Sequence, residues 1–144
     1  MRRAGWRLAR LPEVLVHMTD HDARLTRTDA RYARAAFRRL KQAWLADGVL
    51  RTNTSVAVWG AGRSGRPWIR WLKESGHHVP FVVDVGQTGA RHGSPIVRPE
   101  ELAVRDAQHC IVAVGAAGAR AIIRDAIRCL RPRWREGVDW WAVC

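Results

Sequence analysis

The most informative residues in this sequence are the glycines of a turn over residues 60–65, because their spacing is typical of phosphate-binding turns. The turn reads Gly-Ala-Gly-Arg-Ser-Gly and directly follows a short apolar run. In the G-x-G-x-x-G spacing, Gly60 permits a tight turn and Gly62 lets the backbone approach a phosphate, while Gly65 lets the next helix pack closely on the strand. The pattern predicts a strand-to-helix turn that binds an anionic group.

Two polar residues of this turn are candidates for contacts with the same anion. A helix is predicted over Ser64–Ser75, with Gly76 as its stop. Its first backbone N–H groups and the positive end of its dipole would face the turn, so Ser64 is included in the predicted site. Arg63 could bind a phosphate through its guanidinium, or it could be one more exposed arginine in an arginine-rich chain.

An acidic residue follows the next apolar run at the distance that dinucleotide-binding folds use. The run over residues 79–83 ends in Asp84, which lies 19 residues after Gly65 (84 − 65). A carboxylate about 20 residues beyond the last glycine binds ribose hydroxyls in such folds. We therefore predict that Asp84 contacts a ribose and disfavours NADP, whose extra phosphate would meet its charge. NAD and a nucleotide sugar are the candidate ligands.

The elements that must hold these residues alternate along the chain. Three apolar runs, at residues 55–59, 79–83 and 109–114, are the expected strands. The predicted helix separates the first run from the second. A polar loop over 86–93, an extended segment over 94–97 and a small helix from Pro99 separate the second from the third. A helix through about Leu130 and a last strand over residues 138–143 follow. This order predicts an α/β, Rossmann-like parallel sheet with flanking helices.

The expected strand order adds a second loop to the candidate site. The strand at Ser55 should lie between the strands at Val79 and His109, as in open sheets whose order reverses at the first strand. Residues 60–65 and the glycine-containing loop from Gly115 would then flank one crevice at the carboxyl edge of the sheet. Gly115 is therefore a predicted binding residue.

The first 50 residues are predicted to be an N-terminal arm, and residues 51–144 the Rossmann-like domain. The arm should contain an edge strand over residues 11–18 and a helix over residues 30–46 capped by Asp29. Phe37, Leu40 and Trp44 share one helical face and are expected to point inward. If these three are exposed instead, they would mark a surface that meets another domain.

The composition restricts the partners that we expect. The chain carries a net charge of +12, but its 25 basic residues are 23 Arg and 2 Lys and are spread evenly along it, so nucleic acid is not the expected partner. No apolar run approaches the length of a membrane span, and no signal peptide is expected. Cys110 and Cys129 are predicted to be buried free thiols in a reducing cytoplasm.

Residue patterns for catalysis or metal binding are weak in this sequence. Asp20-His21-Asp22 matches the D-x-D metal motif, but only 19 residues precede it, so we interpret the match as accidental. His77 and His78 are adjacent and would point to opposite faces of a strand. We predict no catalytic residue and no metal ligand.

The order of motifs resembles the C-terminal region of bacterial family 2 glycosyltransferases. Residues 11–29 are similar to the end of such a catalytic domain, and His21 matches the family's late histidine. The Pro, Gly and Ser of the family's following turn are replaced here. Residues 56–65, 81–84, 92–97, 112–115 and 139–144 are similar, in this order, to a small Rossmann-like module that some members carry after that point. One departure is Val85, which stands where the family commonly has a second acid.

The resemblance implies a C-terminal glycosyltransferase module that lacks the catalytic core. Such a module would bind a nucleotide or nucleotide sugar, dock the catalytic domain or self-associate, and would not be catalytic alone. Two other functions remain open from the residues themselves: a small NAD(P)-binding oxidoreductase or cofactor sensor, and a docking module that binds no small molecule.

Overall fold

The computed structural model describes residues 16–17, 19, 21–50 and 53–144. Its contacts divide the chain into two compact units, with the boundary after Ala36. The predicted edge strand lies largely outside the described residues. The second unit, from Phe37 onward, contains the sheet and both core clusters, so Leu45 and Leu50 belong to the core of the sheet.

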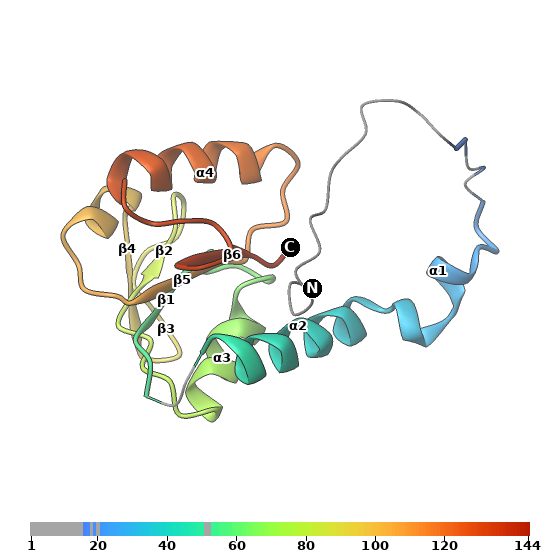
Figure 1. The fold of residues 1–144 in the computed structure, drawn as a ribbon, viewed down its shortest axis with the longest axis horizontal. Helices are drawn as coiled ribbons and strands as arrows, with labels where there is room; N and C mark the ends of the chain where they lie inside the picture. The colour runs from blue at the N-terminus through green and yellow to red at the C-terminus, as the bar shows by residue number, and fades with distance from the viewer. Residues whose placement is uncertain (1–15, 18, 20, 51–52) are drawn as a thin grey trace. The chain divides into compact units, whose positions relative to one another are not determined.

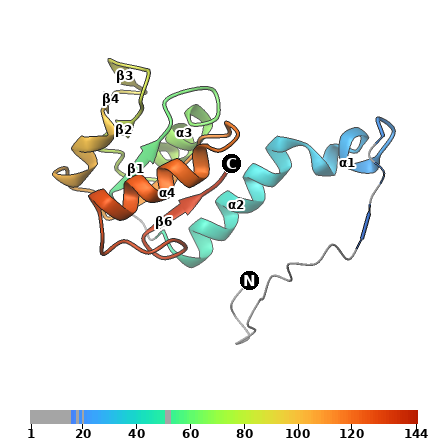
Figure 2. The same cartoon turned by 90° about the horizontal axis from the view of Figure 1, so that it is seen from above.

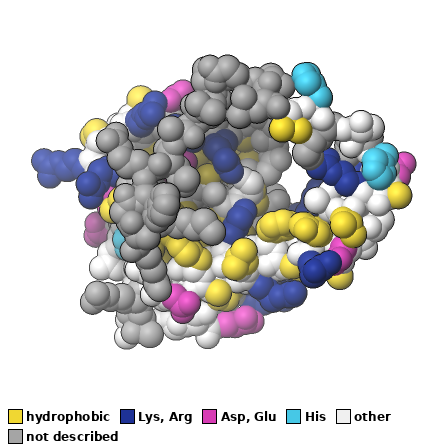
Figure 3. All heavy atoms as spheres, turned by 45° about the vertical axis from the view of Figure 1, so that its right-hand side comes forward, with side chains coloured by type: hydrophobic (Ala, Val, Ile, Leu, Met, Phe, Trp, Pro, Cys, Tyr) yellow, Lys and Arg dark blue, Asp and Glu magenta, His cyan; other side chains and the backbone are white. Residues whose placement is uncertain are grey.

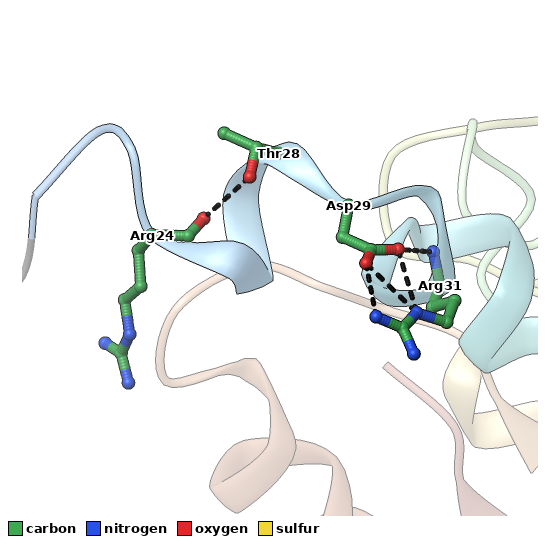
Figure 4. Close-up of polar contacts among 4 residues, drawn as sticks. All are labelled: Arg24, Thr28, Asp29 and Arg31. Carbon is green, nitrogen blue, oxygen red and sulfur yellow. Dashed lines mark hydrogen bonds and ion pairs between the residues drawn. The ribbon is translucent and has the colours of Figure 1, made fainter.

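The described part of the first unit contains short helical turns held by local contacts (Figure 4). The helix α1 spans Leu25–Thr28, and the 3-10 helix η1 spans Ala30–Tyr32. Asp29 caps η1, since its carboxylate accepts a hydrogen bond from the backbone N–H of Arg31 at 2.8 Å. The Arg31 guanidinium binds the same carboxylate and holds the pKa of Asp29 below its usual value. Asp29 was predicted to cap a longer helix and instead caps this turn.

The second unit is built on a six-stranded sheet. Its strands are β1 (Val56–Trp59), β2 (Val82–Val83), β3 (Ala90–Arg91), β4 (Ser94–Val97), β5 (His109–Val112) and β6 (Trp140–Ala142). Their order across the sheet is β3-β4-β2-β1-β5-β6, and only the β3–β4 pair is antiparallel. The predicted α/β parallel sheet is confirmed.

The strand order reverses at β1, as predicted. β1 pairs with β2 on one side and with β5 on the other, with Val58 opposite Val82 and Ile111 respectively. The five parallel strands therefore have the order of a Rossmann-like sheet, and the loops after β1 and β5 leave the same edge. In such sheets ligands bind outside the carboxyl ends of the strands at this point of reversal.

Helices cover both faces of the sheet (Figures 1 and 2). The alternation of side chains along β1 sends Val56 and Val58 to one face, and Ala57 and Trp59 to the other. The first face packs against α3 (Arg66–Glu74) and against the C-terminal part of α2 (Arg34–Gly48). The second packs against α4 (Ala119–Leu130) and the 3-10 helix η2 (Pro99–Ala103). Trp59 and Trp68 are core residues.

The prediction that Phe37, Leu40 and Trp44 point inward is wrong. Their side chains are 46%, 68% and 48% exposed. The helix packs through a different face instead, because Leu45 is buried in the core and the ammonium group of Lys41 donates a hydrogen bond to the carbonyl oxygen of Val143 at 2.8 Å. Figure 3 shows exposed hydrophobic side chains in a broken row, with Lys and Arg side chains beside them.

The segment predicted as a polar loop over residues 86–93 contains a strand. β3 and β4 form a hairpin whose two-residue turn is His92-Gly93, and both turn residues have positive φ, 49° and 78°. Two-residue hairpins of this type match the twist of the strands they join. The hairpin places Arg91 at the edge of the sheet near the glycine-rich turn.

Within the part of the chain that the structure describes, no helix combines the length and apolar character needed to cross a bilayer.

Candidate functional site

Two of the three glycines in the turn are required by the fold itself. A Cβ atom on Gly65 would lie 1.7 Å from the carbonyl oxygen of Gly60, so the start of α3 approaches the end of β1 too closely for any side chain. Gly60 has a φ of +116°, and a Cβ there would lie 2.9 Å from the carbonyl oxygen of Ala113. These glycines let the turn close against β1 and against the residues after β5.

Gly62 has no such packing requirement. A Cβ atom at this position would contact only the side-chain Nε2 of Gln87, at 3.5 Å. Its backbone is also in a region that other residues adopt, since it is absent from the glycines with positive φ. The space over Gly62 is therefore open except for Gln87, as expected where a ligand approaches the backbone.

The turn presents backbone N–H groups that no described residue accepts a hydrogen bond from. The N–H groups of Gly65 and Arg66 donate back to the carbonyl oxygen of Gly62, both at 3.1 Å. Among the described residues, the N–H groups of Gly62, Arg63 and Ser64 have no hydrogen-bond acceptor. These three consecutive donors lie just before α3, where the positive end of the helix dipole adds to their attraction for an anion.

Asp84 lies at the end of β2 and binds the turn directly. One of its carboxylate oxygens accepts the N–H of Ala61 at 2.8 Å, and the other accepts those of Gly86 and Gln87 at 2.9 and 3.0 Å. Burial, the largest single influence, raises the pKa of Asp84, but these hydrogen bonds and the nearby Arg91 outweigh it and leave the pKa below its usual value. The carboxylate is charged at neutral pH and fixes the turn.

A carboxylate has about four acceptor positions, and three of those on Asp84 are used by backbone groups. The predicted ribose contact would therefore use the remaining one. The structure gives Asp84 a second role that the spacing did not indicate, which is to hold the glycine-rich turn against β2.

Two further residues at this turn were not found from the sequence. The Arg91 side chain donates through Nε to the carbonyl oxygen of Ala61 at 3.1 Å and through a terminal nitrogen to the side-chain oxygen of Gln87. Asp84 and Arg91 thus bind both backbone groups of the buried Ala61. Arg91 comes from the unexpected strand β3, and neither residue belongs to a recognisable motif.

The loop after β5 lies beside the turn, as predicted. A Cβ atom on Gly115 would lie 3.7 Å from the hydroxyl oxygen of Ser64 and 3.8 Å from the Cβ of Cys144. Gly115, Arg63 and Ser64 are all exposed, so the structure brings the predicted binding residues together at one edge of the sheet. Arg120 of α4 binds the carbonyl oxygen of Cys144 at the same edge.

The described residues contain no group of three or more His, Cys, Asp or Glu side chains that could hold a metal ion. Asp20 of the D-x-D pattern lies outside them, and Asp22 pairs with Arg27 at 2.8 Å. Burial raises the pKa of Cys110 to about 12, so its thiol stays protonated at neutral pH. Cys129 was predicted to be buried but is exposed, because it lies on the outer face of α4.

No family model matches the sequence, and no curated protein matches it.

Proposed function

We propose that this chain is a nucleotide-binding module that works with a family 2 glycosyltransferase catalytic domain. The observation that carries the binding part of this proposal is the row of three unused N–H donors at Gly62, Arg63 and Ser64. They lie where the strand order reverses, which is the ligand position of open α/β sheets. The exposed Arg63 guanidinium adds a charged donor for a diphosphate.

A nucleotide fits this edge better than a simple anion does. The remaining acceptor position of Asp84 suits a ribose hydroxyl, and the charge of the carboxylate opposes the 2′-phosphate of NADP. NAD or a nucleotide sugar is therefore the proposed ligand. The association with a glycosyltransferase rests on the resemblance of the motif order. We assign the chain no catalytic step of its own, and we place it in the cytoplasm.

A second candidate function is docking without a small ligand, and α2 supports it. Leu40 and Trp44 are large apolar side chains that are about half to two thirds exposed on one face of this helix. Exposed apolar stripes of this kind are typical of surfaces that meet another protein. In this alternative, the glycine-rich turn would serve only the fold.

A thermal-shift panel tests the ligand directly, with NAD, NADP, a UDP-sugar, AMP and coenzyme A each at millimolar concentration. A ligand at 100 times its dissociation constant stabilises the native state by about 2.7 kcal/mol. For a chain of this size, that corresponds to a rise in Tm of roughly 10 °C. NAD or the UDP-sugar should give the largest rise.

Gly62→Val is the matched control for this panel. The fold has room for a side chain at Gly62, so the ligand-free Tm should change little. The added methyl groups would block phosphate approach, so the ligand-induced rise should disappear. An equal rise in the variant would place the ligand elsewhere, and no rise with any ligand in the wild type would favour docking.

A further inference from the structure

The carboxamide of Gln87 lies over the open side of Gly62. Its Nε2 atom is 3.5 Å from the position that a Cβ atom of Gly62 would occupy. Gly62 is the first of three consecutive residues whose N–H groups have no acceptor among the described residues. A side chain with two N–H donors is therefore placed where an anion bound by the turn would lie.

Arg91 determines which end of the carboxamide faces the turn. A guanidinium can only donate hydrogen bonds, so the group of Gln87 that it binds must be the side-chain oxygen. The NH₂ group is then left on the side of Gly62. The orientation follows from the chemistry of the two partners.

Gln87 is also held at its backbone. Its N–H donates to Asp84 at 3.0 Å, and Arg91 is itself fixed by the hydrogen bond from its Nε to the carbonyl oxygen of Ala61 at 3.1 Å. Gln87 is consequently held at its backbone N–H and at its side-chain oxygen by residues that bind the turn. Little side-chain freedom would be lost when it binds a ligand.

We propose that Gln87 donates hydrogen bonds from Nε2 to a phosphate oxygen of the ligand, with Arg91 as the positioning residue that orients it. This inference rests on the proposed nucleotide function and names the ligand group, a phosphate of a nucleoside diphosphate, that Gln87 recognises. The turn binds the phosphate from its backbone side, and Gln87 binds it from the side of β3.

The test uses inorganic pyrophosphate, ADP and adenosine as probes of the full chain, with affinity measured by calorimetry. Gln87→Glu keeps an acceptor for Arg91 but places a carboxylate beside the phosphate. Gln87→Ala removes the donor without adding charge. Loss of a hydrogen bond to a charged group should weaken pyrophosphate and ADP binding ~10- to 100-fold in both variants. Adenosine binding should be unchanged.

Thr88→Glu is the matched charge control, since it adds the same charge at the neighbouring exposed position. It should weaken pyrophosphate binding much less than Gln87→Glu does. For Arg91, the readout is the NMR signal of the Gln87 side-chain NH₂. Pyrophosphate should shift this signal in the wild type and in Arg91→Lys, which keeps a donor, but not in Arg91→Met.

Each outcome decides between the two proposals. Unchanged ADP affinity in the Gln87 variants overturns the role of Gln87 and leaves the proposed function standing. Tighter binding by Gln87→Ala also overturns it, because the carboxamide would then occupy the place of the ligand. Pyrophosphate binding with the NH₂ shift but no nucleotide binding supports Gln87 and contradicts the nucleotide. A wild type that binds neither pyrophosphate nor ADP overturns both.

Discussion

The three glycines of the turn differ in whether the fold would tolerate a side chain at their positions. Gly65 is needed because β1 and α3 nearly touch, and Gly60 because the backbone there has a positive φ beside Ala113. Gly62 is needed by neither and faces open space with Gln87 above it. Gly62 is therefore the glycine of this turn that packing does not explain, and it is the one that the proposed ligand would approach.

These differences predict stability losses of very different size for two similar substitutions. Gly65→Ala should lower the free energy of unfolding by about 3 kcal/mol or more, because the new methyl group overlaps the carbonyl oxygen of Gly60. Gly62→Ala should change it by about 0.5 kcal/mol or less. Urea denaturation of both variants measures this, and comparable losses would contradict the assignment.

Asp84 should make the free energy of unfolding of the chain fall at acidic pH. Its pKa is lower in the folded state than in the unfolded state, so its contribution is fully present above the unfolded value, about 4. The contribution is lost as the pH falls through the folded pKa. Asp84→Asn should therefore cost about 1–3 kcal/mol at pH 7 and progressively less as the pH falls below about 4.

Denaturant titrations of wild type and Asp84→Asn between pH 2 and 7 give the difference curve. Asp29 and Glu101 also have lowered pKa values, but they contribute equally to both proteins and cancel in the difference. A difference that does not change with pH would show that the Asp84 carboxylate does not hold the turn through its charge.

At the level of single residues, the sequence was informative only where the backbone imposes a spacing. Gly60 and Asp84 directly follow β1 and β2, and Gly65 is the N-cap of α3, so their separation follows from the lengths of these elements. Gln87 and Arg91 reach the same turn through a two-residue strand and through side-chain contacts. No local pattern marks such residues, because only the folded chain brings Arg91 to Ala61 and Gln87 to Gly62.

At the level of elements, the runs that become central strands were predicted well, and so was most of α2, but the face through which α2 packs was not. The strands at Val56 and His109 are buried on both faces, so their apolar character is continuous and unambiguous. α2 has apolar residues on two faces, and periodicity cannot tell which face meets the sheet. Leu45 faces it, and the larger stripe at Phe37, Leu40 and Trp44 does not.

The hairpin of β3 and β4 was missed for a related reason. Its turn, His92-Gly93, lacks the Asn-Gly or Asp-Gly signal that most such turns carry. Histidine is nevertheless among the residues that adopt positive φ more often than most. The short strand Ala90–Arg91 is also too brief to show an alternating pattern.

The face of α2 that packs can be measured with a pair of leucine substitutions. Leu45→Ala should lower the free energy of unfolding by about 2–5 kcal/mol, because it leaves a cavity in the core. Leu40→Ala should change it by about 0.5 kcal/mol or less, because that side chain is already 68% exposed. Chemical denaturation compares the two, and a larger effect at Leu40 would reverse the assignment of faces.

At the level of the whole molecule, the sheet and its two core clusters lie in the unit from Phe37 onward. A fragment of residues 37–144 should therefore unfold cooperatively, with a Tm close to that of the full chain. A fragment of residues 51–144, which starts at the boundary predicted from the sequence, lacks Leu45 and Leu50. Since both are buried in the core, it should be less stable by about 4 kcal/mol or more.

Calorimetry of the two fragments and the full chain measures this difference. Equal stability of the two fragments would support the boundary at residue 50. A low Tm for both would show that the division after Ala36 does not separate independently folding parts. The charge of +12 is spread along the chain, so the comparison is best made at one fixed ionic strength.

The hydrogen bonds on Ala61 have a consequence for how this turn can be transferred between proteins. Its N–H and C=O groups are held by side chains from the segment between β2 and β4, not from the turn itself. A graft of residues 60–65 into another sheet would carry the sequence of the motif without the groups that set its shape. The unit that can be transferred is the turn together with residues 84–91. Asp84, Gln87 and Arg91 would have to be transferred together with the glycines.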